Sequence, residues 1–262
     1  MDKLLTLMNF SHVYENEKFY LSEEYNWVDC TTVNGTNGYC DEFALEILKE
    51  KVQAIKAEGI HFIDSGNYHY VSEVWIDKIK EDFNLIVFDH HSDMIKPVFG
   101  DILSCGSWIM DVVEHNNYLK KVLIIGLSRD QKKTILNKYQ DKVICICDDE
   151  LKSNIKEVIY KSISDKYPVY ISIDKDVLDK KVVNTSWDQG KMDFKALKDI
   201  LHMIISKYKI IGIDICGENE VNRVKDIEIN DEVNIGILKF LSNEEIFTES
   251  IDDKKNQICL EA

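Results

Sequence analysis

The chain has 262 residues and 45% of them are hydrophobic, which excludes a generally disordered protein and allows a sizeable core. Its formal net charge of −15 argues against nucleic acid or an anionic membrane surface as the main partner, and fits small cationic substrates or metal ions better. No apolar segment approaches the ~20 residues needed to span a bilayer, and the N-terminal sequence lacks the basic region of a signal peptide. The seven cysteines show no disulfide-like spacing, so we expect reduced thiols in a cytoplasmic protein.

Apolar runs alternate with stretches of helical spacing along the chain. In chain order they predict a strand over 4–8, a helix over 42–58, a strand over 60–63, a helix over 71–80, a strand over 85–88, a helix over 108–113, a strand over 122–125, a small helix around 135–136, a strand over 143–147, a helix over 151–159, a strand over 169–173, a helix over 194–205, a strand over 210–213 and a last helix over 231–241. The polar, aromatic-rich residues 14–27 are interpreted as a connection. Strands that are apolar throughout and separated by amphipathic helices indicate a parallel sheet covered on both faces, so we expect one α/β domain over residues 1–262.

A run of potential metal ligands follows the apolar strand at 85–88. If the strand geometry continues, Asp89, His91 and Asp93 project from one side, because side chains alternate with a period of two. Their oxygen and imidazole donors suit Mn²⁺ or Mg²⁺, with Zn²⁺ less favoured because no thiolate joins them. Burying such carboxylates side by side is costly without a cation, so the segment predicts metal binding. His90 points the other way and is expected to be a hydrogen-bonded histidine.

Other predicted strands also end in polar side chains. In open α/β sheets functional groups gather outside the carboxyl ends of the strands. His69 follows the strand at 60–63, Asp174 and Asp176 end the strand at 169–173, and Glu218 follows the strand at 210–213. Six ligands of this kind suit two ions bridged by carboxylates. The predicted set of metal ligands is His69, Asp89, His91, Asp93, Asp174 and Asp176.

Three motifs, in the same order along the chain, resemble those of the ureohydrolases, the family of arginase, agmatinase and formiminoglutamase. The G-G-x-H, D-x-H-x-D and S-x-D-x-D-x-x-D motifs of that family are similar to residues 66–69, 89–93 and 172–179. The resemblance covers roughly residues 59–241. It implies a three-layer α/β/α arginase-like sandwich around an eight-stranded, largely parallel sheet.

The resemblance also implies a ligand set and a reaction. One Mn²⁺ would be held by His69, Asp89, Asp93 and Asp174, and a second by Asp89, His91, Asp174 and Asp176. Two cations that share a water make hydroxide available near neutral pH, and this hydroxide would attack the planar carbon of a guanidinium or amidine. Asp93 would aim the hydroxide and Glu218 would pair with the positive nitrogen plane of the substrate. The expected enzyme is a manganese-dependent C–N hydrolase of a small cationic guanidino or amidino compound, and family members often form trimers or hexamers.

Several positions depart from the family pattern. Asn67 replaces the second glycine of the first motif, and Lys175 replaces the usual apolar residue of the third. The family glutamate usually stands where this chain has Gly217, and Glu218 is one residue further on. Cys105 lies near the place where many arginases have a proton-shuttle histidine. L-Arginine is therefore not implied as the substrate.

Two alternatives stay open. The adjacent His90 and His91 raise the possibility of a zinc deacylase of the histone-deacetylase type on the same architecture, although the carboxylate-rich ligand set argues against it. The shifted Glu218 and the missing shuttle histidine are also compatible with a metal-binding protein that has lost catalysis. Trp187 lies where the family places a pocket loop, and both a substrate wall and plain packing fit it equally.

Overall fold

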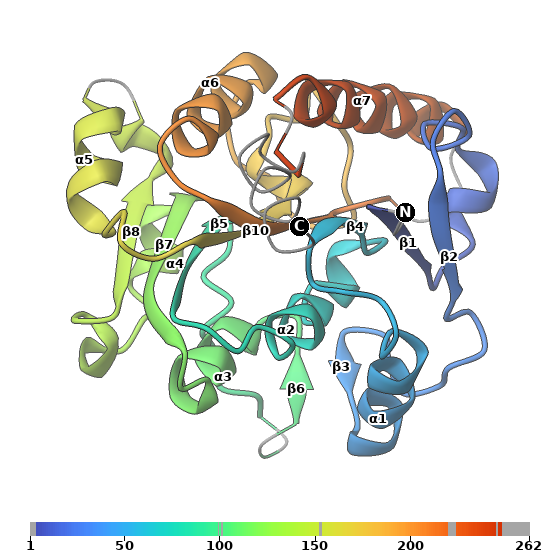
Figure 1. The fold of residues 1–262 in the computed structure, drawn as a ribbon, viewed down its shortest axis with the longest axis horizontal. Coiled ribbons are helices and arrows are strands. Elements are labelled where there is room, and N and C mark those ends of the chain that lie inside the picture. The colour runs from blue at the N-terminus through green and yellow to red at the C-terminus, as the bar shows by residue number, and fades with distance from the viewer. Residues whose placement is uncertain are drawn as a thin grey trace, which may run out of the picture.

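The structure, a computed structural model, describes residues 4–98, 100, 102–151, 154–219, 224–244 and 246–247. Its centre is an eight-stranded sheet in the order β2-β1-β4-β10-β9-β5-β7-β8, in which every neighbouring pair is parallel (Figure 1). The strands are β1 (Leu5–Asn9), β2 (Tyr25–Asp29), β4 (Gly59–Phe62), β5 (Phe83–Phe88), β7 (Leu119–Leu127), β8 (Val143–Cys147), β9 (Val169–Asp174) and β10 (Ile210–Cys216). A separate antiparallel pair joins β3 (Tyr39–Cys40) to β6 (Leu103–Ser104).

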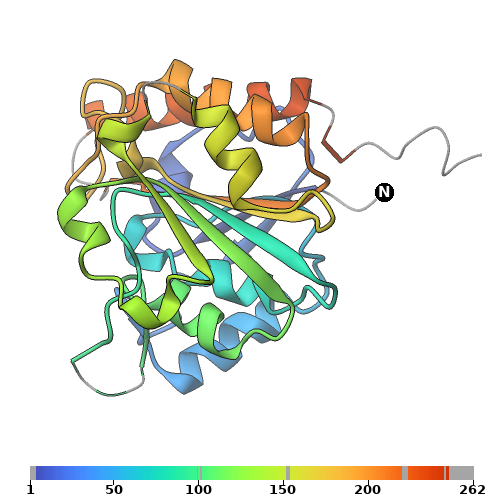
Figure 2. The same ribbon diagram turned by 90° about the vertical axis from the view of Figure 1, so that its left-hand side faces the viewer.

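Helices cover both faces of this sheet, as Figures 1 and 2 show. On one face lie α5 (Ile155–Ser162), α6 (Phe194–Ile205) and α7 (Val224–Asn243), and on the other lie α1 (Glu42–Lys51), α2 (Val71–Ile76) and α3 (Trp108–His115). The short α4 (Arg129–Lys132) follows β7, and the 3-10 turns are η1 (Val13–Asn16), η2 (Gly66–Tyr68), η3 (Asn137–Tyr139), η4 (Asp148–Glu150) and η5 (Lys175–Val177). The predicted three-layer α/β/α sandwich is confirmed.

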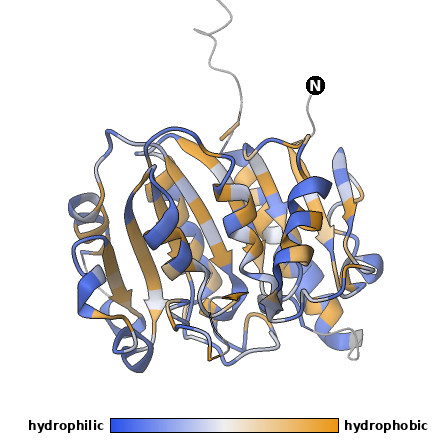
Figure 3. Ribbon diagram, turned by 90° about the horizontal axis from the view of Figure 1, so that it is seen from below, coloured by the Kyte–Doolittle hydropathy of each residue, from blue (hydrophilic) through white to orange (hydrophobic). Residues whose placement is uncertain are grey.

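The two hydrophobic cores follow from the alternation of side chains along the strands. In β5, Ile86 and Phe88 join the core that includes α6 and α7, whereas Leu85 and Val87 join the core under α1, α2 and α3. Each fully buried side chain of this size stabilises the fold by about 1.5–3 kcal/mol relative to an exposed one. Figure 3 shows mostly hydrophobic strands, and helices that carry both hydrophobic and hydrophilic residues. These cores anchor the strands whose ends carry the polar motifs.

The structure corrects some of the predicted elements. All seven predicted strands are present, but β2 (Tyr25–Asp29) lies in the segment interpreted as a connection. It is an edge strand in which only Val28 is buried, so it lacks the apolar run that marks the others. The first helix ends at Lys51 and the second at Ile76, both earlier than predicted. Residues 135–136 lie between α4 and η3 rather than in a helix, and the last helix begins at Val224 rather than near 231.

Within the described residues, no helix combines the length and the apolar character that crossing a membrane requires. The segment after Glu244 lies almost wholly outside the described residues.

Candidate metal centre

Four neighbouring strands at the middle of the sheet end near one cavity. β4, β10, β9 and β5 are neighbours in the strand order, so the loops that follow them lie together. The cavity has a volume of about 150 Å³ and is lined by Gly66, His69, Asp89, His91, Asp93, Ile95, Cys105, Gly106, Gln131, Asp174, Asp176 and Trp187. All six residues predicted as metal ligands line it. Glu218 does not.

His69 organises the more buried part of the cavity, which we call the inner group: His69, Asp89, Asp93 and Asp174. His69 Nδ1 lies 2.9 Å from Asp93 Oδ2, 3.3 Å from Asp89 Oδ2 and 3.6 Å from Asp174 Oδ2. The other ring nitrogen, Nε2, lies 2.9 Å from the Ser172 hydroxyl. A hydrogen bond at one ring nitrogen fixes the orientation of the imidazole and leaves the other nitrogen for an ion.

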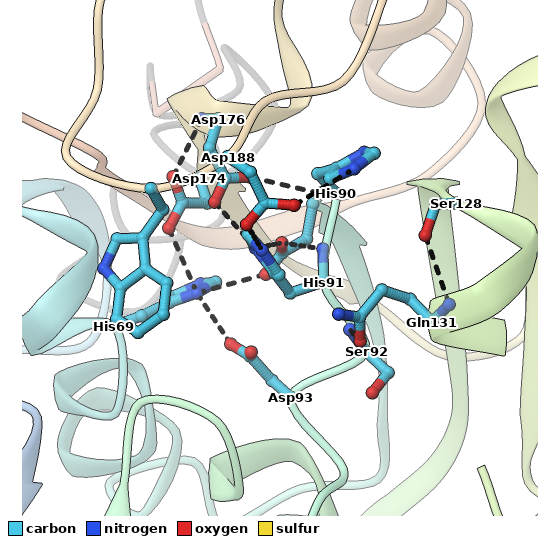
Figure 4. Close-up of polar contacts among 12 residues, drawn as sticks. His69, His90, His91, Ser92, Asp93, Ser128, Gln131, Asp174, Asp176 and Asp188 are labelled. Carbon is cyan, nitrogen blue, oxygen red and sulfur yellow. Dashed lines mark hydrogen bonds and ion pairs between the residues drawn. The ribbon is translucent and has the colours of Figure 1, made fainter. Parts of the chain in front are cut away.

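His91 organises the outer group, which consists of Asp89, His91 and Asp176. His91 Nδ1 lies 2.9 Å from Asp176 Oδ2 and 3.5 Å from Asp89 Oδ1. Its Nε2 lies 2.8 Å from Asp188 Oδ1. Figure 4 shows the two side chains facing each other. Asp188 therefore orients the ring from the solvent side, in the way that carboxylates orient metal-binding histidines. Asp188 lies outside the sequence motifs that predict the ligands.

Asp89 connects the two groups, because its Oδ2 faces His69 and its Oδ1 faces His91. This is the arrangement expected of a bridging carboxylate. Asp174 was also predicted to bridge, and this role stays a prediction, because its side chain lies with those of His69 and Cys216. Its Oδ2 faces His69, while its Oδ1 accepts a hydrogen bond of 2.9 Å from the backbone N–H of Asp176.

The burial of four carboxyl groups in this cavity is costly without a cation. Asp89 and Asp176 are 1% exposed, Asp174 is 3% exposed and Asp93 is 6% exposed. Burial and the charge of Asp89 raise the pKa of Asp93 to about 6, and burial with the charges of Asp174 and Asp89 raises the pKa of Asp176 well above its usual range. Asp89 Oδ2 has no hydrogen-bond partner among the described residues. The donor set therefore fits divalent cations that prefer oxygen and imidazole ligands.

Asp93 is held in place by its surroundings. Its backbone adopts a left-handed conformation with φ of 47°, which is uncommon for a residue other than glycine. The Trp108 indole donates a 2.7 Å hydrogen bond to Asp93 Oδ2, and the Ile109 N–H donates to the Asp93 carbonyl. Strained backbone of this kind is found where the surrounding contacts determine it, often at functional sites.

Glu218 lies away from the cavity, so the structure does not support the substrate-binding role predicted for it. Its side chain is fully buried and forms an ion pair with the Nζ of Lys175, which is also fully buried. Asn234, on α7, donates a 2.8 Å hydrogen bond to Glu218 Oε1 and accepts one of 2.9 Å from Lys175 Nζ. Lys175 separates the two ligands Asp174 and Asp176 in sequence, so this pair ties the ligand-bearing loop to α7.

Gly217 occupies the position where the family glutamate was expected. Its φ is 96°, and a Cβ built there would lie 2.5 Å from Asp174 Oδ1. A side chain therefore has no room at residue 217 beside the inner group. The glutamate one residue later points instead to Lys175.

Trp187 and Cys105 also form part of the cavity wall. The Trp187 indole donates a 3.0 Å hydrogen bond to Asn67 Oδ1, and its ring lies edge-on to His91 with centroids 5.8 Å apart. The substrate-wall interpretation of Trp187 thus fits its position in the cavity lining. Cys105 also lines the cavity, and burial together with the charge of Asp93 raises the pKa of its thiol to about 12. It is a protonated thiol near neutral pH.

The fold and the cavity define a class of protein: an α/β/α sandwich that gathers histidines and aspartates able to hold metal ions at the carboxyl edge of a parallel sheet. A family model described as the arginase family matches residues 4–236. The chain belongs to the arginase family, and the resemblance to the ureohydrolases is confirmed.

Individual relatives agree with this assignment. A Thermotoga maritima protein described as uncharacterized is 30% identical over 245 residues, which cover 92% of this chain and 90% of the relative. The structure is similar to formimidoylglutamase from Bacillus subtilis, with a TM-score of 0.70, 14% identity, and 95% of this chain and 89% of that chain covered. It is also similar to Trypanosoma cruzi formiminoglutamase with Mn²⁺, with a TM-score of 0.62, 11% identity, and 89% and 92% covered.

Proposed function

We propose that this protein is a binuclear, manganese-dependent hydrolase that cleaves a C–N bond of a guanidino or amidino compound. The observation that carries the proposal is the meeting of two ligand groups, around His69 and His91, at the shared carboxylate of Asp89. Membership of the arginase family supports it, as does the Mn²⁺ named for the similar formiminoglutamase.

Different residues of the chain would hold the two cations, orient the water and position the imidazole of His91. His69, Asp89, Asp93 and Asp174 would hold one cation, and Asp89, His91 and Asp176 would hold the other. When bound, the two cations supply an acidified water as the nucleophile near neutral pH. Asp93, fixed by Trp108, would accept a hydrogen bond from that water and orient it. Asp188 would keep the imidazole of His91 in place.

The cavity favours a cationic, planar substrate group. Its lining contains carboxylates but neither lysine nor arginine among the described residues, so the only positive charge that an anionic substrate group would meet there is that of the bound cations. Trp187 and Ile95 provide apolar wall beside the carboxylates. A guanidinium or amidinium can lie against an indole and be attracted by its π-system, while the charge of the carboxylates is largely balanced by the two cations.

The test is an assay of the full-length protein reconstituted with Mn²⁺. Arginine, agmatine, guanidinobutyrate, guanidinopropionate and formiminoglutamate are offered separately, and the released urea, formamide or ammonia and amine are measured. We expect turnover of at least one compound, lost on chelation and restored by Mn²⁺. Metal-loaded protein that is silent on every compound would overturn the proposal in favour of a metal-binding protein without this catalysis.

A further inference from the structure

A thiol that is remote in sequence from the metal-binding motifs lies against the inner group. Cys216 is the last residue of β10 and is paired in register with Asp174 of β9. Its Sγ lies 3.2 Å from Asp174 Oδ2, and the side chain is buried, with 1% exposure. Asp174 Oδ2 is the same oxygen that faces His69 Nδ1 at 3.6 Å. Thiol, carboxylate and imidazole therefore converge on one point.

The spacing of these donors suits a single small ion. One donor atom each from His69, Asp174 and Cys216 lie within 4.8 Å of one another. A second observation concerns the same histidine nitrogen: Asp89 Oδ2 lies 3.3 Å from His69 Nδ1, is buried and has no hydrogen-bond partner among the described residues. An ion held between these side chains would satisfy that oxygen.

We propose that Cys216 is a metal ligand, and that its thiolate joins His69 and Asp174 around the inner ion and makes this position prefer Zn²⁺ over Mn²⁺. The inference rests on the metal centre of the proposed function and changes the metal expected at one of its two positions. Thiolate and imidazole ligands favour Zn²⁺, whereas a set of carboxylates favours Mn²⁺ or Mg²⁺. The outer group contains no sulfur, so no thiolate adds to its affinity for Zn²⁺.

Coordination exchanges one bond for another at the sulfur. The S–H bond that points to Asp174 is replaced by a sulfur–metal bond, and the thiol proton leaves to the buffer. Asp174 loses the hydrogen bond from the thiol and gains the cation in its place. The oxidation state of the metal does not change.

The experiment uses Co²⁺ as a spectroscopic substitute for Zn²⁺ in the full-length, metal-free protein. Co²⁺ is added in steps, and binding is measured by equilibrium dialysis while the near-ultraviolet absorption is recorded. A thiolate ligand produces a sulfur-to-cobalt charge-transfer band that oxygen and nitrogen ligands do not produce. The variants are Cys216→Ser, Cys216→Ala and, as a matched control, Cys105→Ser, which removes the thiol that lines the cavity itself.

We expect the band in the wild type and in Cys105→Ser, and its loss in both Cys216 variants, with circular dichroism showing that they are folded. Bound Co²⁺ without a charge-transfer band, or a band that survives in Cys216→Ser, would overturn the inference while leaving the metal centre intact. A protein that binds no Co²⁺ at all would overturn the proposed metal centre as well. The two failures are thus distinguishable.

Competition between metals gives a second readout that does not depend on activity. The metal-free protein is dialysed against equal concentrations of Zn²⁺ and Mn²⁺, and the bound metals are counted by elemental analysis. We expect the ratio of bound zinc to manganese to be at least tenfold lower in Cys216→Ser than in the wild type. An unchanged ratio in that variant would contradict the role of Cys216 in metal choice.

Discussion

Lys175 and Glu218 form an ion pair that is completely buried behind the metal cavity. The lysine belongs to η5, between two predicted ligands, and the glutamate follows β10. A buried charge is tolerated when it is paired and hydrogen-bonded, and here Asn234 contacts both partners. Through Asn234, the pair links the loop that carries Asp174 and Asp176 to α7.

Lys175→Met should destabilise the protein by about 3–5 kcal/mol, because it leaves the Glu218 carboxylate buried without its partner. Guanidinium chloride unfolding of the metal-free protein measures the change. The double variant Lys175→Met with Glu218→Gln should recover a large part of the loss, because no unpaired charge is then buried. If the single and double variants are equally unstable, the effect comes from packing rather than from the buried charge.

Glu17→Gln should make stability less dependent on pH. Burial and the charge of Glu218 raise the pKa of Glu17 from 4.5 to about 10, so the folded protein holds this carboxyl protonated near neutrality. A carboxyl group whose pKa is raised in the folded state stabilises the folded protein fully at pH values below the pKa of the unfolded state. For Glu17 this contribution is lost as pH rises from about 4.5 to about 10.

The measurement is urea unfolding of wild type and Glu17→Gln at acidic, neutral and alkaline pH. The variant should gain stability relative to the wild type as pH rises, because glutamine keeps the neutral form and can still accept the hydrogen bond from Asn234. The slope of the difference should approach about 1.4 kcal/mol per pH unit at most. A difference that stays constant with pH contradicts the protonated state assigned to Glu17.

Gly217→Ala should weaken both stability and Mn²⁺ binding. The new Cβ would lie 2.5 Å from Asp174 Oδ1, in a backbone conformation with φ of 96°. Gly38→Ala is the matched control, since Gly38 has φ of 75° but no atom within 4 Å of a new Cβ. The control should therefore show only the cost of backbone strain, about 1 kcal/mol. Thermal unfolding and Mn²⁺ titration should show a larger loss for Gly217→Ala than for Gly38→Ala. Equal losses in the two variants would rule out the clash with Asp174.

Asp93→Asn should abolish turnover, with at least a hundredfold loss, while the fold remains intact by circular dichroism. The carboxylate is both a ligand in the inner group and the acceptor that orients the nucleophilic water in the proposed mechanism. Trp108→Phe is the milder comparison, because it removes the 2.7 Å hydrogen bond to Asp93 but keeps the charge. Near-normal activity of Asp93→Asn would refute the assigned role.

The sequence alone was sufficient for the frame of the fold and for the side chains that line the candidate metal centre. Seven apolar runs predict seven strands of a parallel sheet, and the motifs at 69, 89–93 and 174–176 predict six side chains that the structure does bring to one cavity. These predictions succeed because they depend on local periodicity and on the rule that parallel strands share a carboxyl edge. The strand β2 was not predicted, because this exposed edge strand has no apolar run.

The tertiary structure alone decided which residues support the ligands. Cys216 meets Asp174 through the register of β10 against β9, and Asp188 meets His91 across a separation of 97 residues. Glu218 forms an ion pair with Lys175, and Gly217 has no room for a side chain beside Asp174. Such contacts depend on strand register and on the direction of single side chains, and neither is encoded in a local pattern of residues.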